Sequence, residues 1–66
     1  MTIIEAINAA GSENPIRRKS WRDSSLRIKP TDSESCCELY SDNKFLSKRW
    51  NPYKKDLIAN DWMIVK

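Results

Sequence analysis

The two cysteines of this chain, Cys36 and Cys37, are adjacent, and this limits how a chain of 66 residues can stabilise a fold. A domain of this size buries only about 60% of the surface that its unfolded chain exposes, so small domains often add disulfides, a metal or a partner subunit. Neighbouring cysteines cannot link distant segments. A structural zinc site takes four ligands, usually Cys and His, and the chain has no histidine. We therefore expect two reduced thiols, no metal and no cofactor, with oligomerisation as the source of additional buried surface.

The absence of histidine also limits the catalysis that the chain can perform. Histidine is the commonest general base, and it activates the nucleophile in Ser–His and Cys–His pairs. No two carboxylates of the sequence lie together in an apolar setting that would divide acid and base roles between them. We therefore predict a binding protein and not an enzyme.

Basic residues form two clusters, at residues 17–22 and 48–55, each with aromatic residues nearby. The chain has 12 Lys and Arg against 9 Asp and Glu, a formal net charge of +3. Basic clusters beside aromatic rings suit phosphate-bearing ligands. The sequence lacks the charged start and long apolar run of a signal peptide, and no stretch approaches the roughly 20 apolar residues of a membrane span. We expect a soluble, cytoplasmic protein with no membrane partner.

The pattern of residues 1–66 predicts one α+β domain, in which an N-terminal helix packs on a small antiparallel sheet of four or five strands. Thr2 and Glu5 have the spacing of a capping box at the start of that helix, and Gly11 is placed to end it in a left-handed cap. Strands are expected from residue 16 towards 21 and at 26–29, 36–40, 44–46 and 62–65, with a loop at 31–35 and a tight turn at 41–44.

A second, short helix is expected before the last strand, over residues 53–59, with Asn51 as its cap and Pro52 at its first position. The last strand, residues 62–65, is apolar on both faces. The first helix can cover one of these faces. A second subunit is the simplest cover for the other face in so short a chain, so we expect a homo-oligomer.

Two stretches of the chain resemble a family of small phage and bacterial proteins that includes the second described type of Thoeris anti-defence protein. The first stretch is Ile16-Arg17-Arg18-Lys19-Ser20-Trp21. The second begins at Trp50 and continues, at the spacing of the family, with Asp56, Leu57, Ala59, Asp61 and Trp62. Residues 30–48 do not match and are fewer than in the family, and Arg49 stands where the family has proline.

The resemblance implies a mechanism for the protein. Members of this family sequester the cyclic ADP-ribose-type messengers made by Thoeris defence enzymes and hold them intact, and some similar proteins bind cyclic di- or trinucleotide messengers. They assemble as homo-oligomers, typically tetramers, with pockets between subunits. The expected partner is therefore a cyclic nucleotide signalling molecule, and the expected location is the cytoplasm of an infected bacterial host.

The candidate ligand-binding residues lie in the two matched stretches: Arg17, Arg18, Lys19, Trp21, Trp50, Tyr53 and Asp56. Trp21 either stacks on a purine or packs the first helix onto the sheet. Trp50 either contacts the ligand or serves as a hydrophobic staple or an interface residue. The backbone amides at the start of the following helix are placed to meet a phosphate.

Strand parity divides the basic run, because successive side chains point to opposite faces of a strand. Arg17 and Lys19 share their parity with Trp21, so we expect these two to lie beside it and to neutralise a pyrophosphate. Arg18 shares its parity with Ile16. The alternative for the whole run is a solvated basic face.

We also expect specific roles for Asp56, Asp61 and Trp62. Asp56 either accepts hydrogen bonds from ribose hydroxyls or base amino groups, or pairs with a lysine on the surface. Asp61 is expected to cap a turn or accept bonds from backbone amides, and Trp62 is expected in the core.

The residues are also compatible with two other functions. The basic clusters also suit a small nucleic-acid-binding protein, although the modest net charge and the absence of a known nucleic-acid-binding signature count against a polymer. Exposed aromatic residues can alternatively anchor a module that blocks a host protein.

Overall fold

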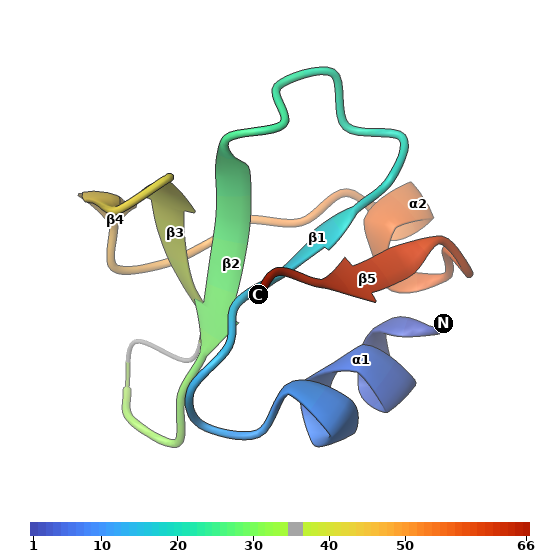
Figure 1. Cartoon of the computed structure of the whole chain (residues 1–66), viewed down its shortest axis with the longest axis horizontal. Coiled ribbons are helices and arrows are strands. Elements are labelled where there is room, and N and C mark those ends of the chain that lie inside the picture. The colour runs from blue at the N-terminus through green and yellow to red at the C-terminus, as the bar shows by residue number, and fades with distance from the viewer. Residues whose placement is uncertain (35–36) are drawn as a thin grey trace.

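Five strands form one antiparallel sheet in the order β4-β3-β2-β1-β5 in the computed structural model, which describes residues 1–34 and 37–66. The elements in chain order are α1 (Ile3–Ala10), β1 (Ile16–Arg18), β2 (Leu26–Pro30), β3 (Cys37–Ser41), β4 (Lys44–Ser47), α2 (Lys54–Leu57) and β5 (Trp62–Ile64), as Figure 1 shows. The predicted α+β architecture is confirmed. The expected start of the third strand at Cys36 lies outside the described residues. The same holds for the Cys36 thiol, one of the two thiols that are expected to be reduced.

The first helix begins as its capping box predicts. The backbone N–H of Thr2 donates to Glu5 Oε1 at 2.8 Å, and the N–H of Glu5 donates to Thr2 Oγ1 at 3.2 Å. These two bonds satisfy amides that the first turn of a helix leaves free. The bond from the Thr2 backbone also lowers the pKa of Glu5.

Gly11 ends the first helix, but the predicted left-handed cap is wrong. Its N–H donates to the Ile7 carbonyl at 3.3 Å, and its φ of 64° is positive as expected. Its ψ of −150° lies outside the left-handed helical region, in a region that essentially only glycine occupies. The chain therefore leaves α1 in an extended direction and runs towards β1.

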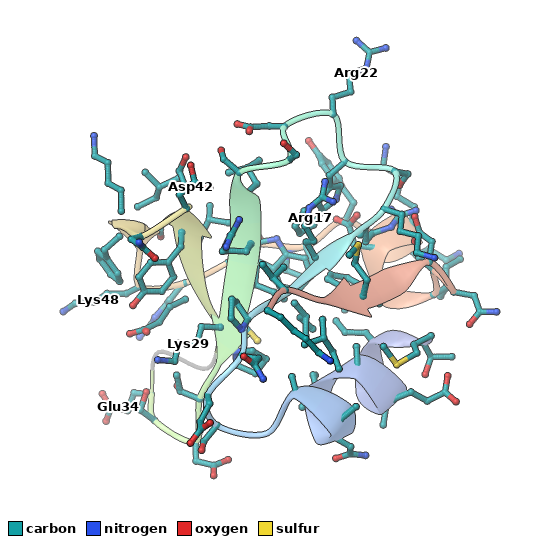
Figure 2. The ribbon with its side chains drawn as sticks, viewed as in Figure 1. Arg17, Arg22, Lys29, Glu34, Asp42 and Lys48 are labelled. Carbon is teal, nitrogen blue, oxygen red and sulfur yellow. The ribbon has the colours of Figure 1, made fainter. Side chains whose placement is uncertain are left out.

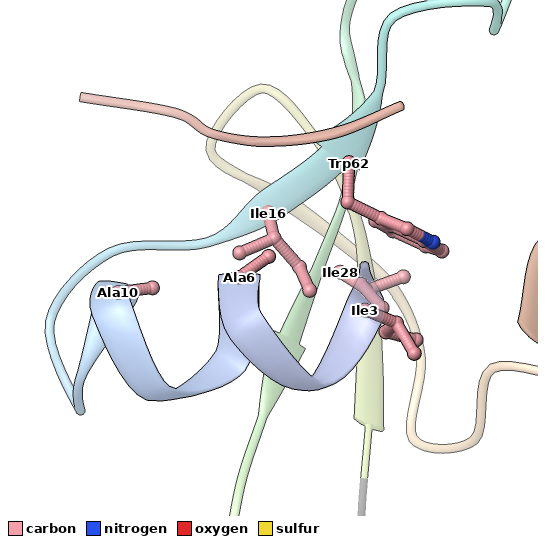
Figure 3. Packing of buried hydrophobic residues seen from close by; sticks show 6 residues of the cluster. All are labelled: Ile3, Ala6, Ala10, Ile16, Ile28 and Trp62. Carbon is pink, nitrogen blue, oxygen red and sulfur yellow. The ribbon is translucent and has the colours of Figure 1, made fainter. Parts of the chain in front are cut away.

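The core lies between α1 and the sheet. Ile16 on β1, Ile28 on β2 and Trp62 on β5 are almost completely buried, and Ile16 pairs directly with Ile28 across the sheet. From the helix, Ile3, Ala6 and Ala10 point towards these side chains (Figure 3). The burial of Trp62 confirms its predicted core position. Its indole N–H donates to the Asp56 carbonyl at 2.9 Å, so this polar group is satisfied inside the core.

The second helix is shorter than expected and has a different cap. It spans Lys54–Leu57, and Tyr53 occupies the N-cap position instead of Asn51. The N–H of Tyr53 donates to Asp56 Oδ2 at 2.9 Å, so a carboxylate inside the helix reaches back to its first free amide. The expected cap at Asn51 is therefore wrong, and the N–H of Tyr53 is not free to meet a phosphate.

Two strand boundaries also bear on the site. The first strand ends at Arg18, because Lys19 and Ser20 form a turn, and β2 extends through Pro30. The predicted tight turn after β3 is confirmed, with Asp42 at a φ of 52°. Within the described residues no helix is long and apolar enough to cross a membrane.

Candidate functional site

An open groove of about 930 Å³ lies beside the end of β1 and brings most of the predicted ligand-binding residues together. Its lining comes from residues 18–26, from Leu39 and from residues 47–56. Five of the seven predicted residues line it, namely Arg18, Trp21, Trp50, Tyr53 and Asp56. These residues come from the two sequence stretches that resemble the Thoeris anti-defence family, so the fold brings both stretches to one surface.

The other two predicted residues, Arg17 and Lys19, do not line this groove. The expected shared face of Arg17, Lys19 and Trp21 requires β1 to continue to Trp21, which it does not, although Arg17 still reaches the Trp21 carbonyl. The strand stops at Arg18, and the Trp21 N–H donates back to the Arg18 carbonyl at 3.3 Å. This turn brings Trp21 to the same groove as Arg18 and breaks the alternation of faces.

Three tryptophans meet at the base of the groove in edge-to-face contacts. The ring centroids are 6.3 Å apart for Trp21 and Trp50, 5.5 Å for Trp21 and Trp62, and 5.7 Å for Trp50 and Trp62. Trp62 is buried, whereas Trp21 and Trp50 are half-buried and line the groove. Aromatic pairs of this kind add about 0.5–1.5 kcal/mol each beyond the burial of their area. Trp21 and Trp50 therefore pack against the core and also border the space that a ligand would enter.

Arg18 binds two carboxylates at once. Its Nε donates to Asp61 Oδ1 at 2.7 Å, and its NH1 donates to Asp56 Oδ1 at 2.9 Å. The side chains of Arg18 and Asp56 are only 15% and 7% exposed. Charge-assisted bonds of this length are stronger than neutral ones. The expectation that Asp56 pairs with a surface lysine is therefore wrong, since its partner is the arginine of β1.

Asp61 holds the turn that leads to Trp21. Its Oδ2 accepts the N–H of Ser20 at 3.1 Å, and its carbonyl accepts the N–H of Lys19 at 3.0 Å. The prediction that Asp61 binds backbone amides is confirmed. The hydrogen bonds from Arg18 and Ser20 outweigh the effect of burial and lower the pKa of Asp61 from 3.8 to about 2.

The second carboxylate of the groove is ionised for similar reasons. Burial alone would raise the pKa of Asp56, but hydrogen bonds from the Tyr53 backbone, from Arg18 and from Trp21 lower it below its ordinary value. In turn, hydrogen bonds to Asp61 and Asp56 raise the pKa of Arg18. At neutral pH these three groups form one ionised network that connects β1, α2 and the turn before β5.

Arg17 and Lys19, the two predicted residues outside the groove, differ in their surroundings. Arg17 donates from NH2 to the Trp21 carbonyl at 3.0 Å and lies 3.8 Å from the Met63 sulfur, so it supports the loop that carries Trp21. Its Nε is buried without a hydrogen-bond partner among the described residues. Lys19 is exposed.

Three groove cations, Arg22, Arg49 and Lys55, were not among the predicted site residues. Lys55 extends over the exposed ring of Tyr53, with Nζ 5.4 Å from the ring centroid. The signal that could have identified Arg49 and Lys55 is the second basic cluster of the sequence, at residues 48–55, and Arg22 belongs to the first, at residues 17–22. Strand and helix boundaries were needed to separate the groove-lining members of these clusters from the solvated ones.

Comparison with known families agrees with this site. The family model of the Thoeris anti-defense 2-like domain matches residues 1–65 of the chain, and the resemblance seen in the sequence is confirmed. No curated protein and no solved structure matches the chain. The match therefore covers both stretches that line the groove.

Proposed function

Because this chain belongs to the Thoeris anti-defense 2-like family, we propose that it binds a cyclic nucleotide immune signal in the groove and sequesters it without degrading it. Membership of the family supports a phage function directed against Thoeris defence. The proposed ligands are cyclic ADP-ribose isomers and cyclic oligonucleotides. The observation that carries the proposal is the presence of two half-buried tryptophans and of basic side chains in one groove.

The shape and the side chains of the groove suit a nucleotide. Its volume of about 930 Å³ falls within the usual range of small-molecule sites. Stacking of a base on an aromatic ring contributes about 1–3 kcal/mol per base, and Trp21 and Trp50 are the rings available for it. Arg18 binds carboxylates of α2 and of the segment before β5, and contacts that are already formed in the free protein reduce the entropy lost on binding.

We favour sequestration over turnover on chemical grounds. The chain has no histidine, and the carboxylates of the Arg18 network already accept bonds from that arginine and from backbone amides. Asp56 and Asp23, the carboxylates that line the groove, therefore already accept hydrogen bonds within the protein and are poorly suited to act as a general base.

An apolar hollow next to the groove supports the proposal of a homo-oligomer, with a tetramer as the expected form. It has a volume of about 490 Å³ and shares Arg49 and Trp50 with the groove. Ile4 and Leu57, which line it, are 65% and 51% exposed. A second subunit seated on these side chains would bury them and would border the ligand at Trp50.

Calorimetric titration with cyclic ADP-ribose isomers, cyclic dinucleotides and cyclic trinucleotides tests this function, with linear nucleotides as controls. We expect saturable binding of at least one cyclic compound and recovery of that compound unchanged. The absence of binding to every cyclic compound would contradict the proposal. Binding to oligonucleotides that weakens steeply with salt would instead favour the nucleic-acid alternative.

A further inference from the structure

Three positive charges of the groove, those of Arg22, Arg49 and Lys55, have no acidic partner among the described residues. The ion pairs in this part of the chain use Arg18 and Arg27, and none of them involves Arg49 or Lys55. The groove carboxylates are already engaged, because Asp56 binds Arg18 and Asp23 accepts the N–H and the hydroxyl of Ser25 at 3.0 and 2.6 Å. Arg49 and Lys55 therefore give the groove an uncompensated positive charge.

The backbone fixes the position of Arg49 on the rim of the groove. The Arg49 N–H donates to Ser47 Oγ at 3.2 Å, and the same hydroxyl donates to the Arg49 carbonyl at 3.1 Å. The next residue, Trp50, donates its N–H to the Cys37 carbonyl at 2.7 Å. Arg49 thus precedes a tryptophan whose own backbone is tied to β3, so the backbone from which the Arg49 side chain extends is held in place.

The position of Lys55 is restricted in a similar way from the other side. It is the second residue of α2, and its ammonium group lies 5.4 Å from the centroid of the Tyr53 ring, which also lines the groove. A cation over an aromatic ring is attracted to it, by about 0.5–1 kcal/mol at exposed sites. This contact directs Lys55 towards the groove without neutralising its charge.

The remaining basic residues of the two clusters are poorly placed to meet a ligand in the groove. The Nε and NH1 atoms of Arg18 are bound to carboxylates, and Arg17 and Lys19 do not line the groove. Lys48 does not line the groove, and Arg22, which does line it, extends its side chain away from the body of the protein (Figure 2). The basic run at residues 17–19, which the sequence favours for phosphate binding, therefore does not supply this contact.

We propose that Arg49 and Lys55 form an anion subsite that takes a phosphodiester or pyrophosphate group of a ligand whose base stacks on Trp21 or Trp50. The proposal rests on the proposed function and adds the residues that recognise the phosphate. Arginine offers a fork of donors that matches phosphate oxygens, and lysine offers a compact charge. Two cations match the two negative charges of a pyrophosphate or of a cyclic dinucleotide.

Titration of the isotope-labelled protein with inorganic pyrophosphate, followed by NMR, tests the subsite directly. We expect shifts in the backbone amides of Arg49 and Lys55 and in the indole signals of Trp21 and Trp50. These shifts should disappear in Arg49→Gln and Lys55→Gln. The matched controls are Lys48→Gln and Lys54→Gln, which remove the same charge one residue away from groove-lining positions.

Two outcomes of this titration would overturn the subsite. One is a set of shifts centred on residues 17–19 or on Arg27 and Lys29. The other is an equal loss of the shifts in the control variants, because it would mean that net charge alone attracts the anion. The spectra of the variants without pyrophosphate report whether each one is folded.

A second measurement separates phosphate recognition from base stacking. We expect Arg49→Gln and Lys55→Gln to weaken the binding of cyclic ADP-ribose isomers by about 5- to 10-fold each, and that of uncharged adenosine by less than about 2-fold. If the wild-type protein binds a cyclic isomer and both variants bind it equally well, the subsite is wrong and sequestration stands. If pyrophosphate maps to the rim and no cyclic nucleotide binds, the proposed function is wrong and the subsite stands.

Discussion

Arg18 Nε lies 2.7 Å from Asp61 Oδ1, and this ion pair joins β1 to the turn that precedes β5. The same guanidinium reaches Asp56 at 2.9 Å and so also holds α2. Asp61 in turn binds the backbone of Ser20, one residue before Trp21. The network thus fixes the turn that leads to Trp21 and also holds α2, whose Asp56 lines the groove.

We expect Arg18→Gln to destabilise the protein by about 2–4 kcal/mol, because it leaves the buried Asp56 carboxylate without its charged partner. The matched control is Arg27→Gln. Its partner Asp42 is 73% exposed, so its loss should cost less than about 1 kcal/mol. Equilibrium unfolding in urea measures both free energies. Equal effects of the two substitutions would show that the network around Arg18 is not a principal source of stability.

Asp61 should make stability depend on pH in the acid range. Its pKa is lowered to about 2 in the folded protein, and its ordinary value is 3.8. Between about pH 4 and pH 2 the unfolded chain therefore binds a proton that the native state does not, and the free energy of unfolding falls as the pH falls. Above that window the full contribution is present.

The variant Asp61→Asn isolates this contribution. Urea unfolding at several values between pH 5 and pH 2 should show a smaller loss of stability in the variant than in the wild type. At neutral pH the variant should be the less stable of the two, since the ion pair with Arg18 is absent. Curves that fall in parallel would mean that Asp61 is not a source of the acid sensitivity.

The proposed function makes Trp50 a stacking surface, and Trp50→Leu tests this. Leucine keeps an apolar side chain against the core but removes the aromatic face, so the affinity for a cyclic nucleotide should fall about 10- to 100-fold. We expect stability to fall by about 1–2 kcal/mol, from the smaller side chain. The control Phe45→Leu removes an exposed aromatic ring that pairs with Tyr40 on another part of the sheet, and it should leave the affinity unchanged. Equal affinities of the two variants, measured by calorimetry, would contradict a stacking role for Trp50.

Local patterns were sufficient to predict much of the fold. The capping box of Thr2 and Glu5 marks the start of α1, and the alternation around Ile28 marks a strand with one buried face. The turn at Asp42 and the apolar run at Trp62 were equally clear. Each of these features depends on residues that are close together in the sequence.

The ion network of the site depends on residues that are far apart in the sequence. Arg18 lies 38 residues from Asp56 and 43 residues from Asp61, and the contacts exist because β1 pairs with β5, with Arg18 opposite Trp62. No local pattern contains that register. Strand parity failed at Trp21 for the same reason, since a distant carboxylate, Asp61, stabilises the turn that ends β1.

The apolar hollow next to the groove leads to a prediction about assembly. Leu57 lines this hollow and is 51% exposed, so Leu57→Arg should leave the fold of the single chain intact. If a second copy covers the hollow, a buried unpaired charge at this position should dissociate the oligomer. Light scattering after size-exclusion chromatography should then show a lower mass for Leu57→Arg than for the wild type.

The control Phe45→Arg places the same charge at a residue that is 46% exposed and does not line the hollow, and it should keep the wild-type mass. A wild-type protein that elutes as a monomer would contradict the proposal, and the exposed Leu57 would then need another partner.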